Sequence, residues 1–239
     1  MGNVLRRGLA SVLVCIVFAA SAGCARETQP QTSEAQQDFE ATVARADAAR
    51  KAGNAESAFE LYTEALRSDG ATDPAGTVKA RQEEAKRLML VRRILATNEP
   101  GISRLGVYVQ AVDYAGLEST ESAAAHKGLA GCLMPYPKEL RAEVASLRTR
   151  VKAGKDIELP LTVKLVSSLA DDWTKELETL PQPAQSDYLS AVASMAKAAS
   201  IVERVFEKDY YSDATLKELQ KADKAIDEAT RALEAKSGD

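Results

Sequence analysis

Apolar residues recur every three or four positions through most of the chain after residue 33, which is the spacing of one face of an α-helix. Ala, Leu, Glu, Lys and Arg dominate these stretches, and the alternating Val, Ile and Thr typical of strands are missing. We therefore expect an all-α protein. The predicted helices cover residues 34–52, 55–69, 75–97, 101–115, 120–134, 137–153, 160–180, 184–209 and 213–236.

Glycines and prolines separate the predicted helices. Gly53 and Gly70 stand where a helix end needs a left-handed residue, and Pro cannot continue a helix already begun. We therefore expect one break at Pro135 and Pro137. In the helix predicted over 160–180, an apolar stripe is expected on one face and charged residues on the other. Its members are Val166, Leu169, Trp173, Leu177 and Leu180.

The helices fall into pairs that begin about 40 residues apart, a rhythm typical of stacked helical hairpins such as an α-solenoid. The last helix carries charged residues that suit the outer face of a cap, among them Asp227 and Arg231 at ion-pair spacing. A second arrangement stays open, in which the later helices close into a bundle. The predicted units are a signal segment (1–23), a tether (24–33), a helical hairpin region (34–97) and hairpins or a bundle with a C-terminal capping helix (98–239).

The first residues have the pattern of a secretory signal. Arg6 and Arg7 precede an apolar, uncharged run over 9–20, and small residues follow up to Cys24. The alternative is a retained membrane anchor, although the last third of the segment is Ala, Ser and Gly, which contribute little to transfer into lipid. Both interpretations place the remainder of the chain outside the cytosol.

At Ser21-Ala22-Gly23-Cys24 the segment resembles a bacterial lipoprotein signal. The resemblance implies cleavage before Cys24, a diacylglycerol thioether on its sulfur and acylation of the new amino group, hence a lipid-anchored protein of the bacterial cell envelope facing the periplasm or exterior. Ala25 after the Cys resembles proteins sent to the outer membrane where a cell has two. Ser21 departs from the usual Leu or Val, so ordinary signal cleavage after Ala22 stays an alternative.

Residues 39–72 resemble a tetratricopeptide repeat, a helical hairpin of about 34 residues. Gly53, Ala58, Tyr62 and Ala65-Leu66 match the second half of that motif at the expected offsets. The first half departs from it, since polar residues replace its large apolar ones, and a Gly replaces its closing Pro. The other interpretation is an ordinary αα-hairpin with Ala at its crossing point.

The repeat resemblance implies a binding face for a protein or peptide on the first helix. Val43, Asp47, Arg50 and Lys51 fall on the stripe that would line it. The alternative is that these residues form a solvated helix face.

The composition of the chain argues against several classes of function. The net charge of −4 and the absence of a strongly basic domain argue against a nucleic-acid partner. His126 is the only histidine, so a histidine-based triad or a multi-histidine metal site is excluded. Cys132 lies in an apolar context typical of a buried thiol, and Asp171-Asp172 is more typical of solvated surface than of a carboxylate site. We expect no cofactor, no metal and no catalytic residue.

Three functions stay open. The favoured hypothesis is a lipid-anchored scaffold that holds a protein or peptide partner near the membrane and is not an enzyme. The second is a structural bundle that self-associates through the C-terminal helix, with Leu219 and Ile226 in its apolar seam. The third, a carboxylate-dependent enzyme, has only scattered acidic residues in its favour.

Overall fold

The computed structural model describes residues 34–69, 72–97, 99–116, 120–206 and 213–237. These ranges contain nine α-helices and no strand, which confirms the all-α prediction. The helices are α1 (Glu34–Lys51), α2 (Ala55–Arg67), α3 (Thr77–Thr97), α4 (Leu105–Ala115), α5 (Thr120–Leu133), α6 (Pro135–Lys152), α7 (Leu161–Leu177), α8 (Ala184–Phe206) and α9 (Asp213–Ser237), with a short 3-10 helix, η1 (Ile102–Arg104), before α4.

The break predicted at Pro135 and Pro137 is nearly absent. Helix α6 begins at Pro135, and Met134 alone separates it from α5. The backbone N–H of Met134 still donates to the Ala130 carbonyl at 2.8 Å, which continues the α5 pattern. Prolines fit here because the first turn of a helix has no N–H partner to lose. The prolines therefore mark the junction of two nearly consecutive helices and no loop.

The long helix α3 contributes side chains to two separate apolar cores. The smaller core lies between α1, α2 and the first half of α3, where Val78 and Ala85 contribute. The larger core takes Val91 from the second half of α3 and extends through α4 to α9. The change from one core to the other thus occurs inside α3, and the predicted boundary at residue 98 falls just after that helix ends.

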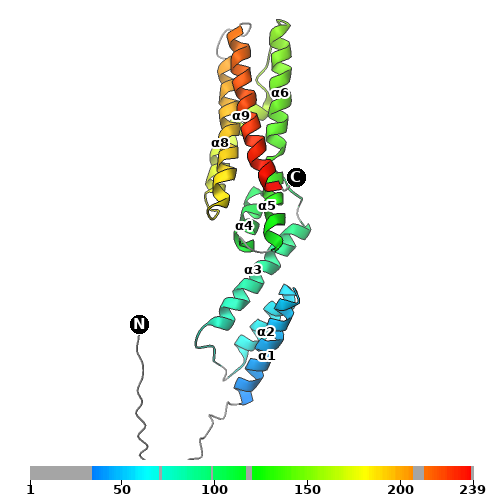
Figure 1. Ribbon diagram of the computed structural model, residues 1–239, viewed down its shortest axis with the longest axis vertical. Coiled ribbons are helices and arrows are strands. Elements are labelled where there is room, and N and C mark those ends of the chain that lie inside the picture. Colours follow the sequence, from blue (N-terminus) through cyan, green and yellow to red (C-terminus); the bar gives the residue numbers. More distant parts are fainter. Residues whose placement is uncertain (1–33, 70–71, 98, 117–119, 207–212, 238–239) are drawn as a thin grey trace, which may run out of the picture.

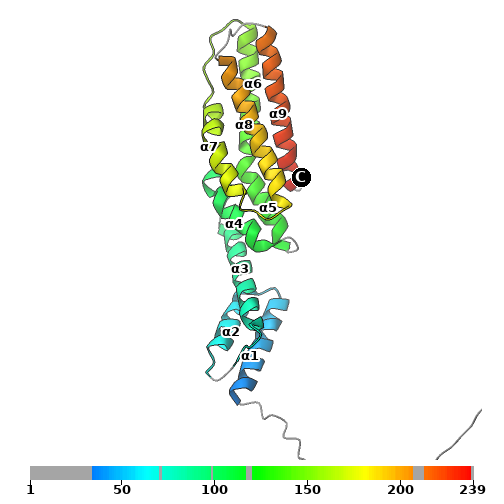
Figure 2. The same cartoon turned by 90° about the vertical axis from the view of Figure 1, so that its left-hand side faces the viewer.

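The C-terminal helices form a bundle. Helices α8 and α9 make the most extensive helix pair, α7 packs against α8, and α6 packs against α9 (Figure 2). Helix α5 also contacts α9, so helices that are distant in sequence share one core. In a solenoid each unit contacts only its neighbours. Of the two arrangements left open by the sequence, the bundle is therefore the one found for this part of the chain.

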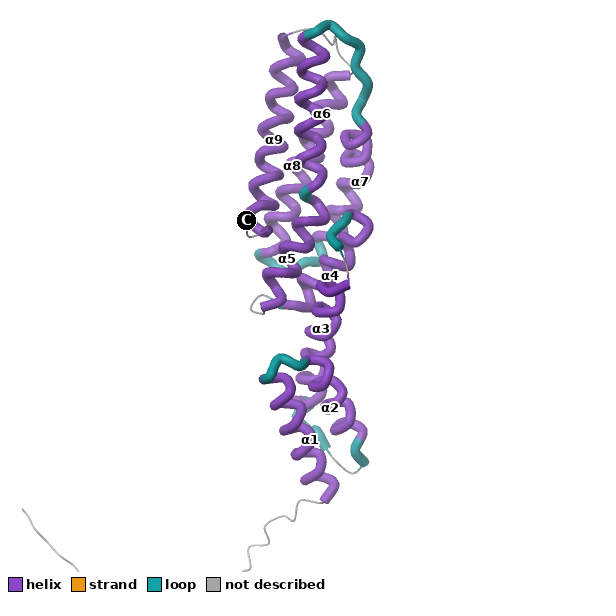
Figure 3. The backbone as a smooth tube through the Cα atoms, turned by 90° about the vertical axis from the view of Figure 1, so that its right-hand side faces the viewer, coloured by secondary structure: helices purple, strands orange, loops and turns teal. Residues whose placement is uncertain are grey.

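The molecule is elongated, with the α1–α2 hairpin at one end and the bundle at the other (Figure 1). The connection from Ala153 to Pro160 runs beside the bundle, so α7 begins some way below the end of α6 (Figure 3). Ile157 and Leu159 of this connection pack against the larger core. This arrangement places the start of α7 on the outside of the bundle.

Candidate functional site

A tight turn joins α1 to α2 and holds these helices together. Gly53 has a φ of +79°, in the left-handed region that favours glycine. The Asn54 side chain caps α2 by accepting a hydrogen bond from the Ser57 backbone N–H at 3.1 Å. Ala46 and Ala58 are fully buried in the core between the helices. Because these side chains are small, α1 and α2 can pack closely together. This packing fixes the position of α1.

Three side chains from three helices meet at the centre of the hairpin unit. The buried Tyr62 hydroxyl on α2 donates a hydrogen bond to the Asp47 carboxylate on α1 at 2.5 Å. Arg81 on α3 donates to the other oxygen of the same carboxylate at 2.7 Å. Burial, together with this hydrogen bond to an anion, raises the pKa of Tyr62 to about 12. The phenol therefore stays protonated and remains a donor at neutral pH.

A second ion pair joins α1 to α3 in the same register. Arg50 pairs with Glu84 at 2.9 Å, and both pairs connect residues that are 34 positions apart. This separation equals the length of a tetratricopeptide repeat, about 34 residues. The first half of α3 is thus connected to α1 by two ion pairs at the same offset of 34 residues. Opposite charges 34 positions apart are the sequence signal by which Arg81 and Glu84 could have been found.

The four predicted contact residues have different surroundings. Val43 is half-buried against the smaller core, and the Asp47 and Arg50 side chains hold α3. Lys51, the last residue of α1, is exposed. The structure therefore brings Asp47 and Arg50 together with α3 and leaves Lys51 facing solvent. Partner binding by these residues stays a prediction, because no partner is present.

Arg92 connects the hairpin to the bundle. Its guanidinium donates to the Gly53 carbonyl at the α1–α2 turn. It also donates to the Glu121 carboxylate on α5 at 2.7 Å. Burial of Glu121 acts to raise its pKa, but hydrogen bonds from Arg92 and Thr120 outweigh this effect and lower the pKa overall. A cavity of about 680 Å³ lies beside this junction, lined by Asn54, Met89 and Arg93 among others.

The other residues considered from sequence lie apart from this site. The His126 ring stacks on Tyr188, with Nδ1 3.0 Å from the hydroxyl, and Cys132 is buried. Burial raises the pKa of the Cys132 thiol, which disfavours the reactive thiolate. Asp171 and Asp172 are exposed. No group of three or more metal-ligating side chains is found among the residues that the structure describes.

No protein-family model, curated protein or solved structure gives a significant match to this chain. Of the helices described, none is both long and apolar enough to cross a membrane. Cys24, the predicted site of lipid attachment, lies outside the described residues.

Proposed function

We propose that this protein is a lipid-anchored, extracytoplasmic interaction module that holds a protein or peptide partner and carries out no catalysis. Lipid on Cys24 would attach it to the membrane through the tether at 24–33, and the helical unit at 34–97 would present the binding surface. The signal segment supports the location in the cell envelope, and the resemblance to a tetratricopeptide repeat supports the binding role.

One observation carries the binding role. The ion pairs Asp47–Arg81 and Arg50–Glu84 connect α1 to α3 at a constant offset of 34 residues. Repeat proteins bind extended segments on the surface that their successive first helices form together. Rigid placement of two such helices lowers the conformational entropy that binding would otherwise cost.

The contacts also decide which residues can test the proposal. Charge reversal of Asp47 or Arg50 would break contacts to α3, so a loss of binding would not separate recognition from folding. Ala48 and Lys51 are exposed on α1, and the structure gives neither side chain a partner within the described ranges. These two positions are therefore suited to a photo-reactive amino acid. Ala142, exposed on α6, is the matched control.

The experiment is cross-linking in the native cell envelope, followed by identification of each product by mass spectrometry. We expect Ala48 and Lys51 derivatives to yield the same heavier product and the Ala142 derivative to yield none. Equal products from all three positions, or no product from α1, would contradict the binding role.

The anchor has its own test. We expect the intact mass of membrane-extracted protein to be that of a chain starting at Cys24 with added acyl groups. A chain starting at Gly23 without acyl groups would rule out the lipid and leave the binding role to the cross-linking result.

A further inference from the structure

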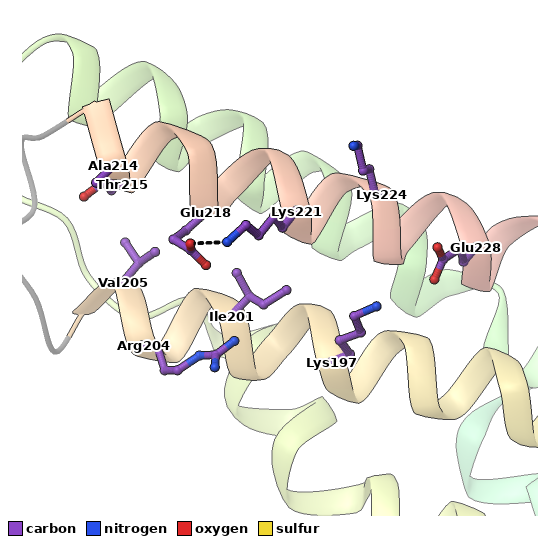
Figure 4. A pocket seen from close by; sticks show the side chains of 10 residues that line it. All are labelled: Lys197, Ile201, Arg204, Val205, Ala214, Thr215, Glu218, Lys221, Lys224 and Glu228. Carbon is purple, nitrogen blue, oxygen red and sulfur yellow. Dashed lines mark hydrogen bonds and ion pairs between the residues drawn. The ribbon is translucent and has the colours of Figure 1, made fainter.

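A groove of about 690 Å³ runs along the outside of the bundle between the second half of α8 and the first half of α9 (Figure 4). Ile201 and Val205, one turn apart on α8, give it an apolar floor. Their side chains also belong to the larger core, so the floor is held in place from beneath. The groove therefore is a preformed apolar surface on rigid helices.

Four cations and two carboxylates, Glu218 and Glu228, line the groove, so the net charge of its lining is positive. Lys197 and Arg204 lie along α8, and Lys221 and Lys224 lie along α9 (Figure 4). Lys221 pairs with Glu218 at 2.5 Å, whereas the structure shows no ion pair for Lys197, Arg204 or Lys224 within the described ranges. The groove thus concentrates cations on a chain whose net charge is −4. An occupant with apolar side chains and carboxylates would match both features.

The start of α7 presents that combination. Leu161 is 78% exposed and Leu165 is 37% exposed, and both are among the few large apolar side chains exposed in the described residues. They are four positions apart, as Ile201 and Val205 are, so each pair forms a ridge about 6 Å long on one helix face. Helix packing places such ridges into grooves of the facing helix.

Two carboxylates lie next to the start of α7. Glu139 and Glu143 of α6 both approach Thr162, whose hydroxyl donates to Glu139 at 3.1 Å and whose backbone N–H donates to Glu143 at 3.4 Å. One oxygen of Glu143 is buried and has no hydrogen-bond partner. The structure describes the first two turns of α7 completely, and Lys164 is the one charged residue in them. The start of α7 therefore has two carboxylates and one ammonium group near it, and of the two carboxylates that of Glu139 is exposed.

The leucine pair cannot reach the groove of its own chain. Helix α8 lies between α7 and α9, and α7 makes no substantial contact with α9 (Figure 2). Joining the two surfaces therefore requires two molecules. We propose that the start of α7 in one molecule docks into the α8–α9 groove of a second copy, with Leu161 and Leu165 on the apolar floor and the exposed Glu139 carboxylate facing the cations of the groove.

This contact joins two different surfaces, so it is heterologous, and successive copies would associate head to tail. It differs from self-association through the apolar seam of α9, because the leucines that it inserts into the groove, Leu161 and Leu165, are exposed in the folded chain. It does not depend on the lipid anchor or on the partner proposed for α1. Its failure would leave the proposed function unaffected.

Complementation between two variants tests the proposal. The groove variant is Lys197→Glu with Arg204→Glu, and the α7 variant is Leu161→Asp with Leu165→Asp. The full chain in mild detergent is followed by analytical ultracentrifugation over a range of concentrations, and far-UV circular dichroism checks that each variant is folded. We expect the native chain to associate with increasing concentration and each variant alone to associate at least about tenfold more weakly.

An equimolar mixture of the two variants is the decisive sample. Each variant keeps the surface that the other has lost, so we expect the mixture to form 1:1 dimers and no longer assemblies. A native chain that stays monomeric, or a mixture that stays monomeric although both variants are folded, would overturn the proposal. The single Leu161→Asp variant, at the more exposed position, replaces the double variant if the latter unfolds.

Matched controls separate the contact from general effects of charge. Arg150→Glu with Lys152→Glu reverses two exposed cations on α6, and Val107→Asp places a charge at a position that is 37% exposed on α4. Both controls are expected to associate as the native chain does. A similar loss in either control would contradict the assignment of the two surfaces.

Discussion

The Tyr62 hydroxyl on α2 donates a 2.5 Å hydrogen bond to the Asp47 carboxylate on α1. Tyr62 is fully buried, and the same carboxylate pairs with Arg81 of α3. One acidic side chain thus connects all three helices of the smaller core. Asp47, predicted as a partner-binding residue, also has a structural role that its sequence position alone did not indicate.

The variant Tyr62→Phe tests that role. It removes the hydrogen bond and keeps the ring, and we expect the free energy of unfolding to fall by about 1.5–3 kcal/mol, as for a hydrogen bond to a charged group. Urea unfolding followed by far-UV circular dichroism measures it. Tyr114→Phe is the control, since its hydroxyl accepts from Gln110 at an exposed pair, and should change stability by less than about 0.5 kcal/mol. Equal effects of both variants would contradict the prediction.

Gly128 on α5 is expected to tolerate no side chain. A Cβ there would lie 2.0 Å from Cε1 of the buried Tyr108 ring, so Gly128→Ala should destabilise the bundle by about 1–3 kcal/mol despite the better helix propensity of Ala. Trp173 lies in the larger core, so its fluorescence reports unfolding of this part of the chain. An unchanged or raised stability would show that the Tyr108 ring can move aside.

Gly106→Ala on α4 is the matched control for that prediction. Its new Cβ would lie 3.1 Å from Oε2 of Glu176, the mobile end of an exposed side chain. We expect stability to stay constant or to rise by up to about 1 kcal/mol, because Ala favours the helix.

Stability is expected to fall in mild acid because of His126. Burial and the charge of Lys236 lower the pKa of His126 from its ordinary value of 6.5. As the pH falls below that value, the unfolded chain binds a proton that the folded chain does not, so the free energy of unfolding decreases. Thermal unfolding measured between about pH 5 and pH 8 should show this decrease. His126→Gln cannot titrate and should flatten the curve, and an identical curve would contradict the assignment to His126.

Variants at Leu219 and Ile226 test whether the apolar face of α9 serves folding of one chain or association between chains. Both side chains are fully buried within the bundle of one chain. We expect Leu219→Asp and Ile226→Asp to unfold the bundle at every protein concentration, because an unpaired charge in an apolar core costs several kcal/mol. Circular dichroism and ultracentrifugation of the same samples measure this. Folded variants that only lose a concentration-dependent assembly would instead support the α9 seam as an interface.

The helices could be predicted closely from sequence, because their signals are local. Periodicity along one helix and the residues at its ends act over a few positions, so nine spans were placed within a few residues of those observed. Pro135 is the instructive error. Proline stops a helix that precedes it but fits the first turn of the next one, and the residue alone does not distinguish these cases.

What the sequence determined by itself is therefore the all-α class, the spans of the helices and the buried setting of Cys132. Only the tertiary structure decided that α6 lies against α9, where Arg141 pairs with the Asp227 carboxylate at 2.6 Å, whereas Arg231 donates to the backbone carbonyl of Asp227. It also decided that Leu161 and Leu165 stay exposed while Val166, Trp173, Leu177 and Leu180 are buried. The reason is that apolar periodicity shows which face of a helix needs cover, but which distant helix supplies that cover depends on how the whole chain packs.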